Sequence, residues 1–324
     1  MADTLRIGTR GSRLALWQAE FVAERLRAAH PGLEVSVETY RTTGDRDRAT
    51  PLARLPGVGF FVKELEQALL EGAIDLAVHS LKDVPTRVPD GLAVGAAVPE
   101  RDDARDCLVT PAGLALEELP EGAVVGTSSP RRRAMLAALA ASRYGSRRDP
   151  AVGQAGRPDL AFVDLRGNVE TRLRKLADGV CDATVLAAAG LVRLGSMDAR
   201  AVPLKPEVVL PAAGQGALGL EHRADDAPVR RRITALDHEP SRRAVVAERA
   251  VLARLEAGCR TPIGVLGRVE ADGRLHLEAW LLAPDGSRGI RRGETSAGDA
   301  AEAGVRLAEA MLADGAADLM RLEA

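Results

Sequence analysis

Side chains that can do chemistry stand directly after an apolar run in IDLAVHSLKDVP, residues 74–85. The run is short and lies between Gly72 and Pro85, which is typical of a strand covered on both faces of a parallel sheet. Lys82 and Asp83 then fall at the carboxyl end of this strand, where open α/β sheets bind ligands. A carboxylate there can stabilise positive charge or transfer protons. A solvated exit turn with two self-neutralising charges is the alternative.

Cationic side chains stand at the starts of three predicted helices, each after a predicted strand. They occur in GTRGS (Arg10, Ser12), GTSSPRRR (Thr127, Ser128, Ser129, Arg131, Arg132) and LRGNVETR (Arg166, Asn168, Arg172). A cation at a helix N-terminus opposes the macrodipole, so three such cases favour a bound anion. Of 44 Lys plus Arg only four are lysines, which leaves 40 arginines. Genome bias explains much of this excess, but the planar arginine fork also suits carboxylate or phosphate.

Motifs for nucleotides and metals are missing or lack their context. There is no GxxxxGK[ST] loop, and GQGALG (214–219) follows the Pro-broken VVLPAA without an amphipathic helix after it. We therefore interpret GQGALG as a glycine-rich crossover between domains. His79 and His222 have no Cys or His at metal-ligand spacing, so we expect structural imidazoles and no metal.

Cys259 is the cysteine with a candidate chemical role. It lies in EAGCRTP after a strong helix, whose C′ residue we predict to be Gly258, and Arg260 beside it favours the thiolate. An inert loop thiol is the alternative. Cys107 and Cys181 stand in apolar strands, where we expect core positions, and the three cysteines fit neither a disulfide framework nor a zinc site.

The elements that must position these residues fall into three groups. The first has strands at 5–10, 33–40 and 74–80, with helices at 12–30, capped by Ser12, and 60–72. The second has strands at 106–110, 123–130 and 160–167, helices at 131–141 and 168–179, and an apolar segment at 183–192. The third has a helix at 241–258, a hairpin within 265–286 and a helical region at 297–322. This pattern predicts an α/β protein with two lobes, a cleft between them, and a smaller C-terminal α+β domain.

We place the domain boundaries as follows: domain 1 at 1–102 and 211–236, domain 2 at 103–210 with an insertion at about 142–158, and domain 3 at 237–324. The 324 residues are 46% hydrophobic and 28% charged, with a net charge of −2, which argues against long nucleic acid as a partner. No apolar run is long enough to cross a membrane, and charges near the N-terminus argue against a signal peptide. We expect a cytoplasmic protein.

Seven runs resemble the porphobilinogen deaminase (hydroxymethylbilane synthase) family of tetrapyrrole biosynthesis. They are IGTRGSRLALWQA, FFVKELEQALLEG, DLAVHSLKDVP, VGTSSPRRR, LRGNVETRL, LPAAGQGALGLE and LEAGCRTPIG, in the family's order. The resemblance implies two lobes similar to periplasmic binding proteins, plus a third domain. It also implies a transferase that joins four porphobilinogen molecules into hydroxymethylbilane, a precursor of heme and other porphyrins, with release of ammonia.

The resemblance further assigns roles to individual residues. Cys259 would carry a dipyrromethane cofactor through a thioether, and Asp83 with Lys82 would be catalytic. Cofactor contacts would come from Arg10, Ser12, Ser129, Arg131 and Arg132, and substrate contacts from Arg10, Ser12, Phe61, Lys82, Thr127, Arg166 and Arg172. Val58 in LPGVGF departs from the lysine that family members often have there. We expect a monomer that binds porphobilinogen and hands its product transiently to the next synthase.

Two other functions agree with part of the pattern. A non-catalytic two-lobed binding protein or sensor for a small dicarboxylate would explain the lobes and the arginines, but it would not need Cys259 or Asp83. An acyl or phosphoryl transferase would use the Cys259 thiolate as its nucleophile.

Overall fold

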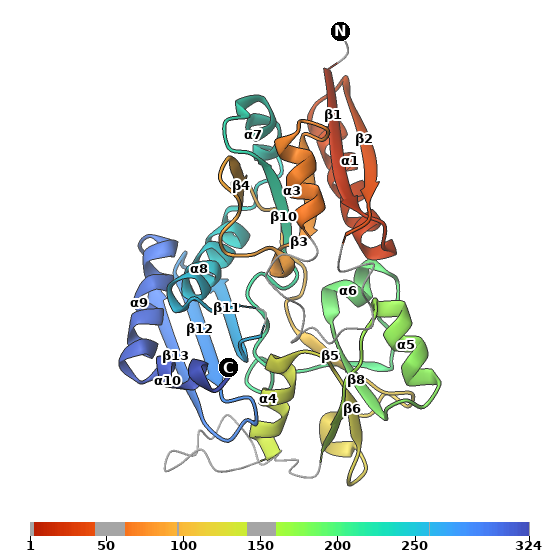
Figure 1. The fold of residues 1–324 in the computed structure, drawn as a ribbon, viewed down its shortest axis with the longest axis vertical. Helices are drawn as coiled ribbons and strands as arrows, with labels where there is room; N and C mark the ends of the chain where they lie inside the picture. The colour runs from red at the N-terminus through yellow and green to blue at the C-terminus, as the bar shows by residue number, and fades with distance from the viewer. Residues whose placement is uncertain (1–2, 43–61, 96, 141–159, 259, 324) are drawn as a thin grey trace.

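The chain forms three β-sheets, each packed against helices, in the computed structural model (Figure 1). The structure describes residues 3–42, 62–95, 97–140, 160–258 and 260–323. Two sheets have five strands and one has three. The predicted fold class, two α/β lobes with a smaller α+β domain, is confirmed. Among the described helices, none is both long and apolar enough to span a membrane.

The first lobe has the strand order β2-β1-β3-β10-β4. Strand β1 runs parallel to β2 and β3, whereas β10 runs antiparallel to both of its neighbours. The strands are β1 (Asp3–Arg10), β2 (Leu33–Tyr40), β3 (Leu76–Ser80), β4 (Leu92–Val94) and β10 (Leu218–Arg223), and the helices are α1 (Arg13–Ala29), α3 (Lys63–Leu70) and α7 (Ala227–Thr234). Because β10 returns from the second lobe, the chain crosses between the lobes twice. The exact domain boundaries stay a prediction.

The second lobe has the order β7-β6-β8-β5-β9, with β6 parallel to β7 and β8 and with β5 antiparallel to its neighbours. Its strands are β5 (Asp106–Val109), β6 (Val124–Gly126), β7 (Ala161–Val163), β8 (Ala183–Ala187) and β9 (Ala201–Pro203). Its helices are α4 (Pro130–Ala140), α5 (Val169–Ala177) and α6 (Ala188–Arg193), with a 3₁₀ turn, η3 (Leu116–Glu118). The apolar segment 183–192 is therefore a strand followed by a helix.

Helix α1 forms part of the contact between the lobes. The core face of α1 carries Ala19, Val22 and Leu26, and the partly buried Phe21 packs against the same cluster. Trp17 is 38% exposed, stacks on Phe21 with ring centroids 5.3 Å apart, and lies under the Arg193 guanidinium of α6. Trp17 therefore lies on the face of α1 that contacts the second lobe, not on its core face.

The third domain packs a three-stranded antiparallel sheet, β11-β12-β13, against two long helices. Its elements are α8 (Glu239–Leu255), β11 (Ile263–Val269), β12 (Leu275–Leu282), β13 (Gly289–Ser296), α9 (Ala300–Ala313), α10 (Ala316–Met320) and η4 (Arg321–Glu323). The hairpin predicted within 265–286 is present: a turn at Asp272-Gly273 joins β11 to β12, and Gly273 takes a φ of +80° there. Strand β13 was not predicted, because its half-exposed edge sequence GIRRGETS has no apolar alternation.

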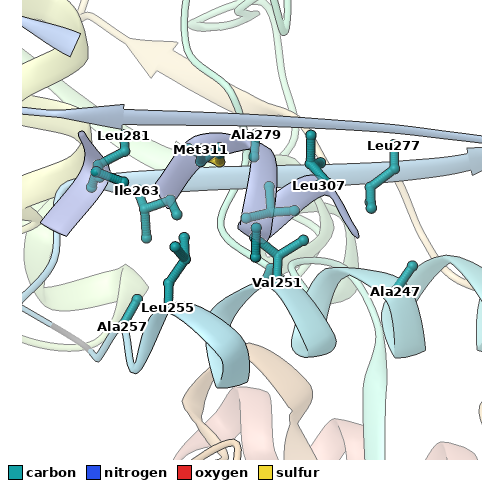
Figure 2. Close-up of a cluster of buried hydrophobic side chains, with 14 of the residues drawn as sticks. Ala247, Val251, Leu255, Ala257, Ile263, Leu277, Ala279, Leu281, Leu307 and Met311 are labelled. Atoms are coloured by element: carbon teal, nitrogen blue, oxygen red, sulfur yellow. The ribbon is translucent and has the colours of Figure 1, made fainter. Parts of the chain in front are cut away.

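The core of this domain anchors both flanks of the Cys259 loop. Figure 2 shows Val251 and Leu255 of α8 directed at the strands, and the same buried cluster continues through Ala257 to Ile263. Burying Ala257 ends the helix at Leu255, and Glu256 adopts the left-handed conformation with φ 55°. The prediction of Gly258 as the C′ residue was wrong for this reason.

Glu248 of α8 joins the third domain to both crossovers between the lobes. Its buried carboxylate accepts backbone hydrogen bonds from Gly214 (2.6 Å) and Gly267 (2.7 Å), and it pairs with the Arg101 guanidinium at 2.6 Å. As predicted, GQGALG forms a crossover: Gly216 has φ +85°, and a Cβ there would lie 2.5 Å from the Asp102 carbonyl oxygen.

Replacing Glu248 with alanine should remove the carboxylate that accepts hydrogen bonds from Gly214, Gly267 and Arg101. We expect Glu248→Ala to lower the free energy of unfolding by about 3–5 kcal/mol, because the Arg101 charge stays buried without a partner. Glu309→Ala is the matched control, since the Arg254–Glu309 pair is about half exposed, and it should cost less than about 1 kcal/mol. Denaturant titration measures both, and equal losses would contradict the role given to Glu248.

Candidate functional site

Lys82 and Asp83 lie directly after strand β3 of the first lobe. The strand ends at Ser80, and a 3₁₀ turn, η2 (Leu81–Asp83), follows it. Leu81 is buried, and its N–H donates to the Ala217 carbonyl at 3.0 Å, so the turn is fixed against the second crossover. The two charged residues therefore stand at the carboxyl end of a buried strand, as the sequence predicted.

A pocket gathers predicted site residues from β1, α1 and β3. Its polar lining comprises Arg10, Ser12, Gln18, His79, Ser80 and Asp83, and its apolar lining comprises Leu14, Ala15, Val62 and Val78. Ser12 is the N-cap of α1, and its hydroxyl accepts from the Ala15 N–H at 3.2 Å. Arg10, Ser12 and Asp83 are thus brought together.

In the second lobe, the arginines at the start of α4 pair with a carboxylate of the chain itself. Arg131 and Arg132 contact the two carboxylate oxygens of Asp106, at 2.8 and 2.7 Å, and all three side chains are buried. Burial opposes the charge on Asp106, but the two guanidinium groups outweigh it and hold the pKa of this carboxyl far below its usual value. The sequence predicted the anion at this helix start, but not that the chain supplies one itself.

Gln215 connects Lys82 to the same carboxylate. The Lys82 ammonium donates to Gln215 Oε1 at 3.1 Å, and Gln215 Nε2 donates to Asp106 Oδ1 at 2.9 Å and to the Ala104 carbonyl at 2.7 Å. Burial, and then the charge of Arg132, lower the pKa of Lys82 to about 8, although Asp83 and Asp106 oppose this. Sequence reasoning missed Gln215; the one available signal was a lone polar side chain within the glycine-rich crossover.

Arg166 and Arg172 stand at the start of α5, which Asn168 caps by accepting from the Thr171 N–H at 2.9 Å. Burial lowers the pKa of Arg172 to about 10, and the charges of Arg132 and Asp83 act on it in opposite directions.

Two buried donors near these arginines lack a hydrogen-bond partner within the described part of the chain. They are Arg166 Nη1 and the Ser128 hydroxyl. Buried polar groups are nearly always satisfied in folded proteins, so both donors require acceptors that the described residues do not supply.

Thr127 and Ser129 have local roles in the structure. The Thr127 hydroxyl accepts from the Ser129 N–H at 3.2 Å, and the Ser129 hydroxyl accepts weakly from the Arg132 N–H at 3.4 Å. Both side chains therefore shape the start of α4, and their ligand contacts stay a prediction. Val58, Phe61, Cys259 and the insertion at 142–158 lie outside the described residues.

The site therefore places one catalytic-type carboxylate, Asp83, in a pocket with Arg10, and the neighbouring Lys82 is linked through Gln215 to Asp106 and the arginines of α4. Such an arrangement suits a ligand that carries several carboxylates and develops positive charge during reaction. Within the described ranges, no group of three His, Cys, Asp or Glu side chains could hold a metal ion.

Two family models match the chain along most of its length. "Porphobilinogen deaminase, dipyromethane cofactor binding domain" matches residues 5–231, and "Porphobilinogen deaminase, C-terminal domain" matches residues 243–313. The chain belongs to the porphobilinogen deaminase family. The recognition made from the seven runs and the enzyme class that it implied are confirmed.

Bacterial porphobilinogen deaminases are similar over nearly the whole chain. The protein of Desulforudis audaxviator is 48% identical and covers 97% of this chain and 96% of its own. That of Geobacter sulfurreducens is 45% identical and covers 98% and 94%. Among solved structures, the methionine binding protein MetQ covers 75% of this chain and 91% of its own at 15% identity, with a TM-score of 0.41.

The lowered Lys82 pKa can be tested through Gln215, because this amide stands between the ammonium and Asp106. A carboxylate in its place would favour the charged ammonium, so Gln215→Glu should raise the Lys82 pKa above its value of about 8. The pH dependence of Lys82 acetylation, followed by peptide mass spectrometry, measures this. Exposed Lys205 is the internal reference for reagent reactivity. An unchanged midpoint would exclude the Gln215 contact.

Proposed function

We propose that this chain joins four porphobilinogen molecules into the linear tetrapyrrole hydroxymethylbilane, releases one ammonia per ring, and builds the product on a dipyrromethane held covalently by Cys259. The observation that carries this proposal is the chain of polar contacts that links Lys82 of one lobe, through Gln215, to Asp106 and its two arginine partners in the other. Each pyrrole ring brings an acetate and a propionate, so a cleft rich in arginines suits a chain that gains two carboxylates per step.

The residues present fit a dipyrromethane. Its carboxylates require donors inside the cleft, and Arg166 Nη1 and the Ser128 hydroxyl are buried donors without a partner among the described residues. Arg10 and Ser12 line the pocket that contains Asp83. We assign the cofactor contacts to Arg10, Ser12, Ser129, Arg131 and Arg132, and the covalent bond to Cys259. When bound, the group supplies a free pyrrole α-carbon as the nucleophile for chain growth.

The chemistry of this chain's own residues follows from their charges. The Asp83 carboxylate can accept hydrogen bonds from pyrrole N–H groups, and it stabilises the positive charge that develops on a substrate methylene as ammonia departs. Lys82 is cationic below its pKa of about 8 and binds a substrate carboxylate beside that charge. Thr127, Arg166, Arg172 and Phe61 complete the proposed substrate contacts.

The remaining biological assignments are also part of this proposal. We infer a cytoplasmic enzyme. A monomer is consistent with a site built by the two lobes of one chain. Transient transfer of the product to the next synthase would protect a reactive hydroxymethyl group.

The covalent group can be measured directly. Purified wild-type protein should show the added mass of one dipyrromethane, located on the Cys259 peptide and positive in a pyrrole colour reaction. Cys259→Ser should lack it, whereas Cys181→Ser should keep it, since Cys181 is a buried core residue. An unmodified Cys259 from a host that makes porphobilinogen would refute the cofactor assignment.

The proposed catalytic role of Asp83 can be tested by comparison with an exposed aspartate of the same segment. Asp83→Ala should reduce turnover of porphobilinogen by at least about 100-fold, because the developing cation loses its counter-charge. Asp90→Ala lies in an exposed turn outside the pocket and should leave turnover unchanged. Steady-state formation of hydroxymethylbilane measures both variants. A binding protein without catalysis would show no turnover in the wild type.

A further inference from the structure

The Asp83 carboxylate depends on the backbone for its position. It lines the pocket with Arg10 and Ser12, and no hydrogen bond or ion pair joins its side chain to another residue in the ranges that the structure describes. Such a carboxylate is available to a ligand. Its place in the pocket is therefore set by the residues on either side of it in the chain.

The turn that carries Asp83 has little hydrogen bonding of its own. Within η2 the Val84 N–H donates to the Leu81 carbonyl at 3.1 Å, and 3₁₀ turns of this length have poor hydrogen-bond geometry. Leu81 and Val84, which flank Lys82 and Asp83, are 1% and 5% exposed and belong to one buried cluster with Val245 of α8. The turn thus depends on the surface against which it packs.

Arg249 of α8 binds the backbone directly after Asp83. Its Nη1 donates to the Val84 carbonyl at 2.9 Å, and its Nη2 donates to the Pro85 carbonyl at 2.7 Å. Residues 84–91 form neither helix nor strand, and within the described chain no backbone N–H donates to either carbonyl. Two donors from one planar group fix the orientation of this backbone as well as its position.

One face of α8 therefore supports the whole turn. Val245 and Arg249 are four residues apart on this helix, so their side chains lie on the same face. Val245 packs against the two apolar anchors of the turn, and Arg249 binds the carbonyls that follow it. The adjacent Glu248 fixes both crossovers between the lobes, and the helix continues to the loop of Cys259.

Arg249 lies outside the Asp83 pocket. It lines a separate cavity of about 230 Å³, together with Leu81 and Thr86 of the first lobe. Its other interaction is electrostatic, with Glu221 of β10, whose carboxylate is 2.9 Å from His79 Nε2. The two carbonyls are therefore the groups that Arg249 binds directly among the described residues.

We propose that Arg249 is a positioning residue of the reaction: by binding the Val84 and Pro85 carbonyls, it holds the Asp83 carboxylate where positive charge develops on the substrate. This inference rests on the proposed function. A displacement of about 1 Å at a reacting group can cost about 100-fold in rate. Loss of a contact outside the pocket can therefore reduce catalysis without removing any contact to the substrate.

The first test does not depend on turnover. Hydrogen exchange, followed by mass spectrometry on peptides that span 81–92, reports local opening of the turn. The N–H groups of Leu81 and Val84 donate to backbone carbonyls at 3.0 and 3.1 Å. Arg249→Ala should make these amides exchange at least about tenfold faster, because the turn loses its support from α8.

Arg243→Ala is the matched control. Arg243 lies on the same helix and also donates to a backbone carbonyl, that of Gly273 at 2.9 Å, but this carbonyl belongs to the third domain itself. Arg243→Ala should leave exchange at Leu81 and Val84 unchanged. Unchanged exchange in Arg249→Ala, or an equal change in both variants, would overturn the inference.

The second test measures turnover of porphobilinogen per molecule that carries the covalent group, counted by intact mass. Arg249→Ala should lower kcat about 10- to 100-fold and leave KM within about threefold, because a transition-state interaction is weakened and no substrate contact is lost. Arg249→Lys should recover part of kcat, since its ammonium can donate to one carbonyl but cannot span both. Arg243→Ala should keep the wild-type kcat.

The third test asks whether Arg249 acts through Asp83. If it does, adding Arg249→Ala to Asp83→Ala should lower the rate by less than about twofold more, because the carboxylate that Arg249 positions is already absent. A general packing defect would instead lower the rate of Asp83→Ala by the same factor as that of wild type. That second result would overturn the inference.

The outcomes separate this inference from the proposed function. If wild type turns over porphobilinogen and Arg249→Ala retains kcat within about twofold, Arg249 is no positioning residue while the function stands. If Arg249→Ala does not fold, Arg249→Lys replaces it in all three tests, and a wild-type kcat in that variant would overturn the inference. A wild type without turnover refutes both.

Discussion

The charge on Asp106 is the interaction on which the site depends. Two guanidinium groups and an ammonium stand close together with little water, and without a counter-charge their mutual repulsion would disfavour this arrangement. Asp106 compensates two of these cations through direct ion pairs and reaches Lys82 through Gln215. The start of β5, the start of α4 and the end of β3 are thereby tied together, although they belong to different lobes.

The same contacts make the crossovers between the lobes part of the site. Gln215 lies in the second crossover, and its carbonyl accepts from Arg101 of the first at 2.7 Å. Next to it, the Gly216 carbonyl accepts from Arg193 at 2.6 Å, and Arg193 also pairs with Asp102. The Gln215 amide thus links these crossovers to Lys82 and Asp106. Glu248, which fixes both crossovers to α8, extends this coupling to the domain that carries Cys259.

Sequence reasoning succeeded where a local signal determines the structure. The end of β3, the Ser12 cap and the starts of α4 and α5 to within a residue are all encoded locally. Asp106, Gln215, Glu221 and Glu248 were missed, because each gains its role from partners far away in the sequence. For Glu221 that partner, His79, is 142 residues away. The helix end at Leu255 was misplaced for a related reason, since packing of Ala257 outweighed the local preference for glycine.

From the cations at helix starts we predicted sites for a bound anion. The structure contains two different kinds of such site. At α4, the chain's own Asp106 satisfies the arginines, so Arg131 and Arg132 contribute positive potential while they remain anchored. At α5, a donor of Arg166 is buried and has no partner among the described residues, so its satisfaction must come from outside them. The two helix starts therefore differ in kind: the cations of α4 are compensated within the chain, whereas Arg166 keeps a buried donor that the described residues do not satisfy.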